Sequence, residues 1–475
     1  MRAQVPVIIT IIVSLLGVFQ NTNGQPSITG NRRTEVPVYR SKNDSIRLAQ
    51  IDASLRELSD HEPVDVVVWD RLKDARDQAF REGVLRFRTI YRPSAEYTLY
   101  DSLKSIKDLR QVKRLSIANR ILRKLPDEVL LCDSLESLEI VNCSLRKIQK
   151  QTAHLSKLKS ITILNNRAKR PLRLSRNTII TTLVIHGDRP DPLPRSYRKF
   201  KELTMLDLSN NVLTSFPNGA VHNRKLNELS LQHNELTLVN DKIKVHSSLE
   251  KLALQFNKIE QVPPSITHFP NLIRLSLNHN LITDVTPTIS SLSKLEYLSL
   301  YNNQLTAVPA GVYAIKSLKI IDLYFNQIES LDSCIRNWSN LQILFIAHNK
   351  LLVFPKELTA MHTLEEIYAH DNRLALLPHD IDKLSKLRII HVNNNLLKDV
   401  PLSLLKLEQL EELDISENYM TYIPETIFDF SNLSFISFMN NPWNAATQSF
   451  LHKKSKELET RDITIRVSGV LQASH

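Results

Sequence analysis

The chain has 475 residues, of which 42% are hydrophobic and 23% charged, a composition that excludes wholesale disorder. It holds only 8 glycines, so little is available for the glycine-rich turns of phosphate-binding and nucleophile-bearing folds. Three cysteines exclude a disulfide framework, and the formal net charge of +11 favours acidic partners.

The first 24 residues are predicted to be a signal peptide. Residues 5–19 are mostly apolar, and Thr22 and Gly24 are small enough for cleavage before Gln25. The apolar run is shorter than the roughly 20 residues that a membrane span needs. We therefore expect an exported protein, which is periplasmic, cell-surface or secreted. An uncleaved membrane anchor is the alternative.

Two segments follow before the chain becomes periodic. Residues 25–93 are predicted to be an N-terminal extension that is partly disordered, because residues 25–60 are polar; a helix is expected over 71–84. Residues 94–111 are predicted to be an N-terminal cap helix, because apolar side chains recur there at helical spacing, at Leu99, Leu103, Ile106 and Leu109.

A 23-residue rhythm governs residues 112–443. Each unit reads Leu-x-x-Leu-x-Leu-x-x-Asn-x-Leu, and its asparagine returns from Asn211 to Asn441 in steps of 23 without a slip. The frame continues upstream to give about fifteen units, with Asn166 in the asparagine column and other residues at Arg120, Cys143 and Asp188. Proline follows six residues after the column in most units.

Each column of the unit has a physical reason. Alternating leucines predict a short strand with one side in the core, and successive units must place their strands in parallel. The asparagine amide can donate to and accept from turn backbone groups, which predicts an amide ladder along the array. Because Arg120 and Cys143 cannot reproduce this ladder, we expect less regular first repeats. Residues 186–192 break the proline rhythm, and we expect a kink there.

This pattern resembles the leucine-rich-repeat family, in its 23-residue LxxLxLxxNxLxxLPxxI form, and is similar to bacterial exported members. The resemblance implies an α/β solenoid: a leucine-rich-repeat horseshoe with a parallel concave β-sheet and a mostly non-helical convex side. It also implies that ligands bind at the concave face. Residues 444–475 are then predicted to be a C-terminal cap, in which the apolar side chains of 444–460, such as Phe450 and Leu458, are followed by a strand over 463–467.

No catalytic signature stands out, so we expect neither an enzyme nor a cofactor. An enzyme would need a catalytic domain outside residues 112–443, and no remaining segment is large enough. His233, His279 and His348 each precede a column asparagine, and His370 and His391 fall on neighbouring strands that lie about 4.8 Å apart. We expect ordinary polar residues there and no metal site.

Positive charge is concentrated in residues 104–201, which hold 23 Lys and Arg against 8 Asp and Glu, or +15. The rest of the chain has 38 against 42, or −4. Such a segment attracts anionic lipid surfaces, acidic glycans or acidic proteins, or is a solvated basic face without a ligand. Nucleic acid is not expected for an exported chain.

The residues predicted to face solvent on the concave side become aromatic and apolar from residue 297 to residue 391. Clustered exposed rings mark interaction sites, although rings on adjacent strands can also stack merely to stabilise a sheet. The predicted partner-binding residues are Tyr297, Tyr301, Asp322, Tyr324, Phe325, Phe345, Tyr368, His370 and His391.

These observations predict a non-catalytic protein–protein interaction scaffold or receptor-like protein that binds at its concave face. The alternative is recognition of a glycan or lipopolysaccharide at the cell envelope, with the rings on sugar faces and the basic segment on acidic groups. The oligomeric state does not follow from the sequence.

Overall fold

The computed structural model describes residues 33–39, 85–91, 93–166, 168, 172–187, 197, 199–219, 222–239, 242–458 and 464–466. The predicted signal peptide, the helix expected over 71–84 and most of the expected kink lie outside these residues. In the predicted extension, β1 (Arg33–Tyr39) pairs antiparallel with β2 (Leu85–Tyr91). Residues 33–39 are therefore a strand where polar composition predicts loose chain, because cross-strand pairing satisfies their backbone.

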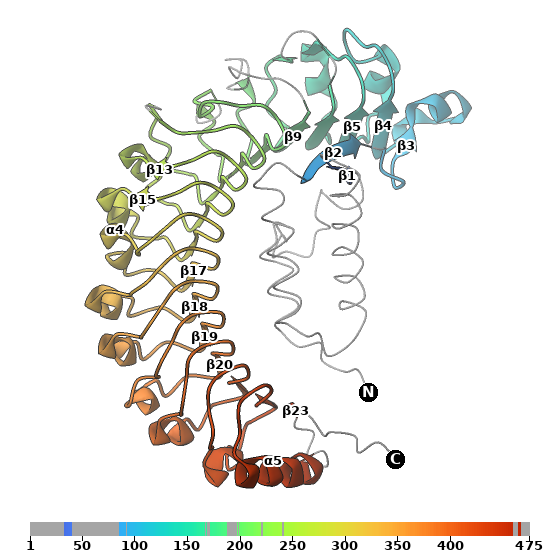
Figure 1. The fold of residues 1–475 in the computed structure, drawn as a ribbon. Helices are drawn as coiled ribbons and strands as arrows, with labels where there is room; N and C mark the ends of the chain where they lie inside the picture. Colours follow the sequence, from blue (N-terminus) through green and yellow to red (C-terminus); the bar gives the residue numbers. More distant parts are fainter. Residues whose placement is uncertain are drawn as a thin grey trace.

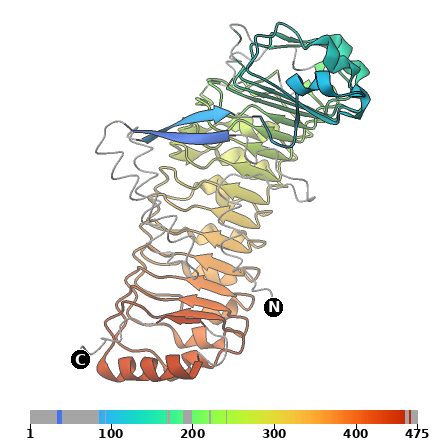
Figure 2. The same cartoon turned by 90° about the vertical axis from the view of Figure 1, so that its right-hand side faces the viewer.

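One long parallel sheet runs through the repeats, and its strands lie side by side in chain order (Figures 1 and 2). The front strands are β3 (Thr98–Leu99), β4 (Arg114–Ala118), β5 (Ser137–Val141), β7 (Ser160–Leu164) and β9 (Thr182–His186). The rear strands are β10 (Met205–Asp207), β11 (Glu228–Ser230), β12 (Lys251–Ala253), β14 (Arg274–Ser276), β16 (Tyr297–Ser299), β17 (Ile320–Asp322), β18 (Ile343–Phe345), β19 (Glu366–Tyr368), β20 (Ile389–His391), β21 (Glu412–Asp414), β22 (Phe435–Ser437) and β23 (Thr464–Arg466).

The strands pair in the register that the repeat predicts, with equivalent positions of successive repeats opposite each other. Leu206 of β10 lies opposite Leu229 of β11, which lies opposite Leu252 of β12. None of the pairings between described strands joins β23 to β3, so the sheet is an open horseshoe and not a closed ring (Figure 1). The predicted α/β solenoid with a parallel inner sheet is confirmed.

Short turns line the outer side of the arc (Figure 1). They are η3 (Asp127–Leu131), η4 (Lys150–His154), η7 (Pro264–His268), η8 (Pro287–Ser291), α4 (Ala310–Tyr313), η9 (Ser333–Asn337), η10 (Lys356–Ala360), η11 (Ile381–Lys383), η12 (Leu402–Lys406) and η13 (Glu425–Phe428). Two small parallel pairs, β6 (Lys147–Ile148) with β8 (Arg173–Leu174) and β13 (Gln261–Val262) with β15 (Asp284–Val285), add to this side. Since nearly all the turns are 3-10 helices, the expected lack of long convex helices is confirmed.

The repeat prolines start these turns. Pro355, Pro401 and Pro424 sit at the N-cap, where the ring's restricted φ fits the entry and the missing N–H is not needed. Each turn then buries an aliphatic side chain, such as Leu358 or Leu404, in the core. Burying such a side chain stabilises the fold by about 1.5–3 kcal/mol, and a repeat can bury it only against its neighbours.

The predicted amide ladder is present in the rear repeats. The side-chain amide of Asn303 donates to the carbonyls of Leu277, Leu300 and Tyr301 at 3.1, 2.9 and 3.2 Å. Its Oδ1 accepts from the backbone N–H of Ile282 at 3.0 Å. The same pattern recurs in the neighbouring repeats, so one buried side chain per repeat satisfies backbone groups that the strand leaves behind.

The two ends differ in how well their caps match the prediction. At the N-terminal end, residues 94–111 are not one helix: they form β3, η1 (Tyr100–Ser105) and η2 (Leu109–Gln111). Pairing of β3 with β4 extends the sheet over its open edge, and this tertiary demand overrides the helical spacing. At the C-terminal end, the expected strand is present as β23, which pairs with β22, and the segment before it forms a helix, α5 (Ala445–Leu458). Among the described residues, no helix is long and apolar enough to cross a membrane.

Candidate functional site

The inner wall of the arc is formed by the side chains that alternate with the buried strand centres. In β18, Leu344 is fully buried in the main core, whereas Phe345 belongs to a separate apolar cluster. This cluster contains Phe345, Tyr368 and Ile389, with Ile320, Tyr324 and Ile343 packed against it. Because alternate residues point to opposite sheet faces, the cluster lies on the face opposite the core.

Rings from successive strands contact one another along this wall. Tyr324 meets Phe345 edge-on at 5.4 Å between ring centroids, and Phe345 stacks on Tyr368 at 4.8 Å. Tyr368 in turn meets His391 edge-on at 5.1 Å. These four rings, the strand rings, come from four neighbouring repeats and form one continuous ladder.

A second ladder, the turn rings, occupies the position just before the ladder asparagine. His233 stacks on Phe256 at 4.2 Å, and Phe256 stacks on His279 at 4.1 Å. Further along, Phe325 stacks on His348 at 3.9 Å. All five have φ values between 53° and 57°, the left-handed region that few non-glycine residues adopt. Sequence reasoning named only Phe325 as a site residue; the 23-residue spacing of histidine and phenylalanine in this column was the available signal.

The predicted site residues are less exposed than expected. Eight of the nine have at most 9% of their surface exposed, and only Tyr324 is half-buried. The expectation of a solvent-facing strip is therefore wrong for most of them. Strands about 4.8 Å apart bring large side chains of adjacent repeats into contact, so each ring is covered in part by its neighbours.

Several polar groups on the wall are hydrogen-bonded to one another. Asp322 accepts hydrogen bonds from the Ser299 hydroxyl at 2.9 Å and from the Tyr324 backbone N–H at 3.2 Å. The Tyr368 hydroxyl donates to Glu366 at 3.0 Å. Burial raises the pKa of Glu366, although this hydrogen bond opposes the shift. These contacts hold the wall in one arrangement.

Tyr297 contacts a basic side chain of the preceding strand. The Arg274 guanidinium lies 4.0 Å from the centroid of the Tyr297 ring, a cation–π contact. Burial raises the pKa of the Tyr297 hydroxyl, and the nearby Asp322 carboxylate adds to the shift. The hydroxyl is therefore neutral at physiological pH and can act as a hydrogen-bond donor.

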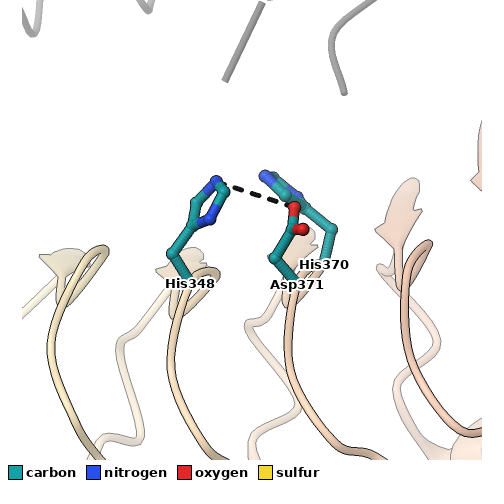
Figure 3. A group of neighbouring side chains, drawn as sticks. All are labelled: His348, His370 and Asp371. Atoms are coloured by element: carbon teal, nitrogen blue, oxygen red, sulfur yellow. Dashed lines mark ion pairs between the residues drawn. The ribbon is translucent and has the colours of Figure 1, made fainter. Parts of the chain in front are cut away.

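One group of side chains could hold a metal ion. His348, His370 and Asp371 offer ligand atoms that all lie within 4.8 Å of one another. Figure 3 shows them projecting from the same side of two neighbouring repeats, with His348 and Asp371 directed toward each other. The sequence placed His370 near His391, but the described ring contacts join His370 to His348 and His391 to Tyr368.

Comparison with known proteins agrees with the repeat geometry. The leucine-rich-repeat family model matches residues 247–305 and 385–442, within the regular rear section. A leucine-rich-repeat protein of Leptospira interrogans is similar in structure, with a TM-score of 0.60 and 24% identity over 78% of this chain and 99% of that one. The chain contains leucine-rich repeats and folds as a leucine-rich-repeat solenoid.

Other leucine-rich-repeat structures share the fold but bind different ligands. The Toll structure of the Drosophila Toll–Spätzle complex has a TM-score of 0.58 and 22% identity, covering 71% of this chain and 52% of that one. The structure of a TLR13–ssRNA13 complex has a TM-score of 0.62 and 18% identity, covering 78% and 56%. A search of curated protein sequences found no match. At these identities the likeness shows the fold, and the ligand has to be argued from the site.

One cluster of this leucine-rich-repeat protein contains the residue types of a hydrolase triad. His186 Nε2 lies 2.9 Å from Asp207 Oδ2 and 3.4 Å from the Ser209 hydroxyl. Ser209 also donates to the other oxygen of Asp207. In a relay, histidine bridges serine and aspartate with its two different nitrogens, whereas here one nitrogen contacts both. The buried cluster instead joins β9 to β10, where the front repeats meet the rear ones.

Proposed function

We propose that this leucine-rich-repeat protein is a non-catalytic binding scaffold that holds a protein partner against its inner wall. The observation that carries the proposal is the apolar ring cluster of Phe345 and Tyr368 on the face opposite the core, with half-buried Tyr324 beside it. Nothing in strand pairing requires rings at these positions, and large rings are the side chains that dominate protein interfaces.

The mutual packing of the rings favours this role. A ring that is already held by its neighbours loses little side-chain entropy when a partner covers its remaining surface. Tyr324 contacts Phe345 on one side and His370 on another, both at 5.4 Å, so its orientation is set before binding. The wall therefore offers a pre-organised apolar centre, and the paired Asp322 and Glu366 carboxylates supply polar groups around it.

The proposal is tested by comparing the proteins captured by immobilised wild-type chain and by a Tyr324→Ala variant. We expect the partner bound by the wild type to be lost or strongly reduced with Tyr324→Ala. The matched control is Tyr422→Ala, which removes a 59% exposed tyrosine in the loop between β21 and η13 and should leave capture unchanged. Equal capture by all three chains would contradict binding at the wall.

A glycan array probed with the same three chains distinguishes a protein partner from a glycan ligand. The glycan or lipopolysaccharide hypothesis requires array binding that falls with Tyr324→Ala, because sugar faces would stack on the same rings. We expect no such binding. Glycan binding that depends on Tyr324, without a captured protein, would replace the protein partner with a sugar ligand.

We also propose that the chain is exported, as the apolar segment at 5–19 and the small residues Thr22 and Gly24 indicate. Mass spectrometry of the mature protein is expected to find an N-terminus at Gln25. A cell-retained product that still carries residues 1–24 would favour the uncleaved anchor instead.

A further inference from the structure

The group of His348, His370 and Asp371 is built from two adjacent repeats, and the backbone fixes its geometry. The backbone N–H of His348 donates to the backbone carbonyl of His370 at 3.1 Å. The backbone N–H of Asn349 donates to the backbone carbonyl of Asp371 at 3.2 Å. His348 and Asp371 occupy the same turn position one repeat apart, with φ values of 53° and 52°. Their side chains therefore leave neighbouring turns in the same direction.

The two imidazoles are also held by aromatic neighbours. His348 stacks on Phe325 at 3.9 Å with 11° between the rings, and His370 meets Tyr324 edge-on at 5.4 Å. The two histidine rings lie 5.4 Å apart and nearly perpendicular to each other. Rings packed in this way keep their nitrogens in place without a ligand, which lowers the entropic cost of binding one.

Asp371 supplies the observation that points to a cation. Its Oδ1 accepts from the side-chain amide of Asn394, which orients the carboxylate. Its Oδ2 is buried and accepts no hydrogen bond from any described residue. That oxygen lies 3.6 Å from His348 Nε2, an ion-pair distance that is too long for a hydrogen bond. Two ligands that are each about 2.0–2.2 Å from one ion stand at a similar separation.

We propose that His348, His370 and Asp371 form a site for a divalent transition-metal ion of the zinc class. Two imidazoles and one carboxylate suit such an ion, whereas calcium and magnesium require mainly oxygen ligands. Three protein ligands leave a coordination position open to water or to another ligand. The Asn394 amide holds the ligating carboxylate from outside, as the outer partners of metal ligands commonly do.

The same turn position elsewhere in the chain provides an internal comparison. His279 precedes its ladder asparagine just as His348 does, but the residue one repeat further is Asn302 and not an aspartate. The Asn302 amide lies 2.9 Å from His279 Nδ1, a direct hydrogen bond. Where the neighbour is an amide, histidine and neighbour bond to each other; where it is a carboxylate, a wider gap remains.

The test is titration of the full-length, chelator-treated protein with Zn²⁺ by isothermal calorimetry. His348→Asn, His370→Asn and Asp371→Asn each introduce a residue that an adjacent or related repeat carries at that position, so the fold should persist. We expect each to weaken the site at least about tenfold, and Asn394→Gly, which keeps the left-handed backbone, to weaken it about 10–100-fold. His279→Asn should leave the titration unchanged.

Co²⁺ provides a second measurement that needs no variant. Added to the wild-type chain, it should produce visible absorption bands that excess Zn²⁺ removes. The proposal is overturned if wild type takes up neither ion, or if Asp371→Asn and His279→Asn both titrate like wild type. In that case His348 and Asp371 form an ion pair only. The site does not depend on the proposed partner, so loss of partner binding with Tyr324→Ala leaves it standing.

Discussion

The front and rear repeats share one frame but hold it with different side chains. The front strands β4, β5, β7 and β9 have five residues each, whereas the rear strands β10–β12 have three. In the front, asparagines occupy the left-handed turn position, and Asn142 and Asn165 donate to Asn119 and Asn142 at 3.1 and 2.6 Å. In the rear, much of this position carries the turn rings.

The asparagine column explains the difference. In the rear it satisfies the turn backbone from inside, and the preceding position carries a ring in five repeats and an asparagine in four. In the front, Arg120 turns outward to pair with Asp101 and lies 5.2 Å over the Tyr100 ring. Cys143 offers only a thiol, 3.6 and 3.3 Å from the carbonyls of Ile117 and Val141. In the front, the weaker inner column is thus accompanied by an amide ladder one position earlier, and the turn rings are found where the inner column is complete.

The largest loss of stability is expected when one of the ladder asparagines of the rear repeats is replaced. Asn303→Ala removes three donated hydrogen bonds and one accepted bond, and should lower the free energy of unfolding by about 3 kcal/mol. Urea unfolding measures it. Cys143→Ala, the front counterpart, should lose only about 1 kcal/mol, because the thiol is a weak donor. Equal decreases in the free energy of unfolding would show that Asn303 and Cys143 stabilise their repeats equally.

A smaller effect is expected at the junction of the two regions. Burial pushes the pKa of Asp207 upward, but the His186 pairing and the Ser209 hydrogen bonds outweigh it and hold that pKa below its usual value of 3.8. A depressed pKa contributes stability that is present above the unfolded value and is lost as pH falls through the folded value. Asp207→Asn should therefore cost about 1.5–3 kcal/mol at neutral pH.

The pH dependence provides the control for this prediction. Urea unfolding at successively lower pH should show the gap between wild type and Asp207→Asn closing once pH falls below 3.8. A gap that is constant with pH would mean that the carboxylate's charge contributes nothing at this junction. Ser209→Ala, which keeps the His186 pairing, is expected to cost less at neutral pH.

The turn rings give a smaller effect again. Phe256→Asn introduces asparagine, the residue that the front repeats carry at this turn position. It removes the two stacking contacts of the Phe256 ring, with His233 and His279. Each stack contributes about 0.5–1 kcal/mol, so a loss of about 1–2 kcal/mol in urea unfolding is expected. Phe256→His keeps a ring that can stack and should lose less. A larger loss with histidine than with asparagine would argue against stacking as the stabilising contact.

The smallest effect tests the charge difference between the regions. Arg123→Ser removes an exposed charge in the basic segment, and Arg373→Ser removes an exposed charge in the rear. If the front binds anionic vesicles, cosedimentation should show about fivefold weaker binding for Arg123→Ser alone, and added salt should weaken binding of every chain. Vesicle binding that does not change with salt concentration would exclude an electrostatic interaction.

Much of this architecture follows from single repeats. Leu344 and Leu358 are buried because alternation and the proline turn direct them inward, and Asn303 bonds to the turn because its amide both donates and accepts. Such consequences depend on the nearest chain neighbours and on one repeat stacking on the next. The structure of the N-terminal cap could not be predicted in this way. Within residues 94–111, β3 pairs with the open edge of β4, and this pairing outweighs the helical spacing of the apolar side chains.

From the amino-acid order alone came the 23-residue frame, the parallel sheet, the inner amide column, the strand at the C-terminal end and the sheet face on which Tyr324 and Tyr368 lie. Only the folded arc decided that the wall rings cover one another and that His348 and His370 converge with Asp371. The reason is that a repeat frame sets where each side chain starts. Ring contact and ligand distance depend on how side chains of different repeats meet once the strands stack and curve.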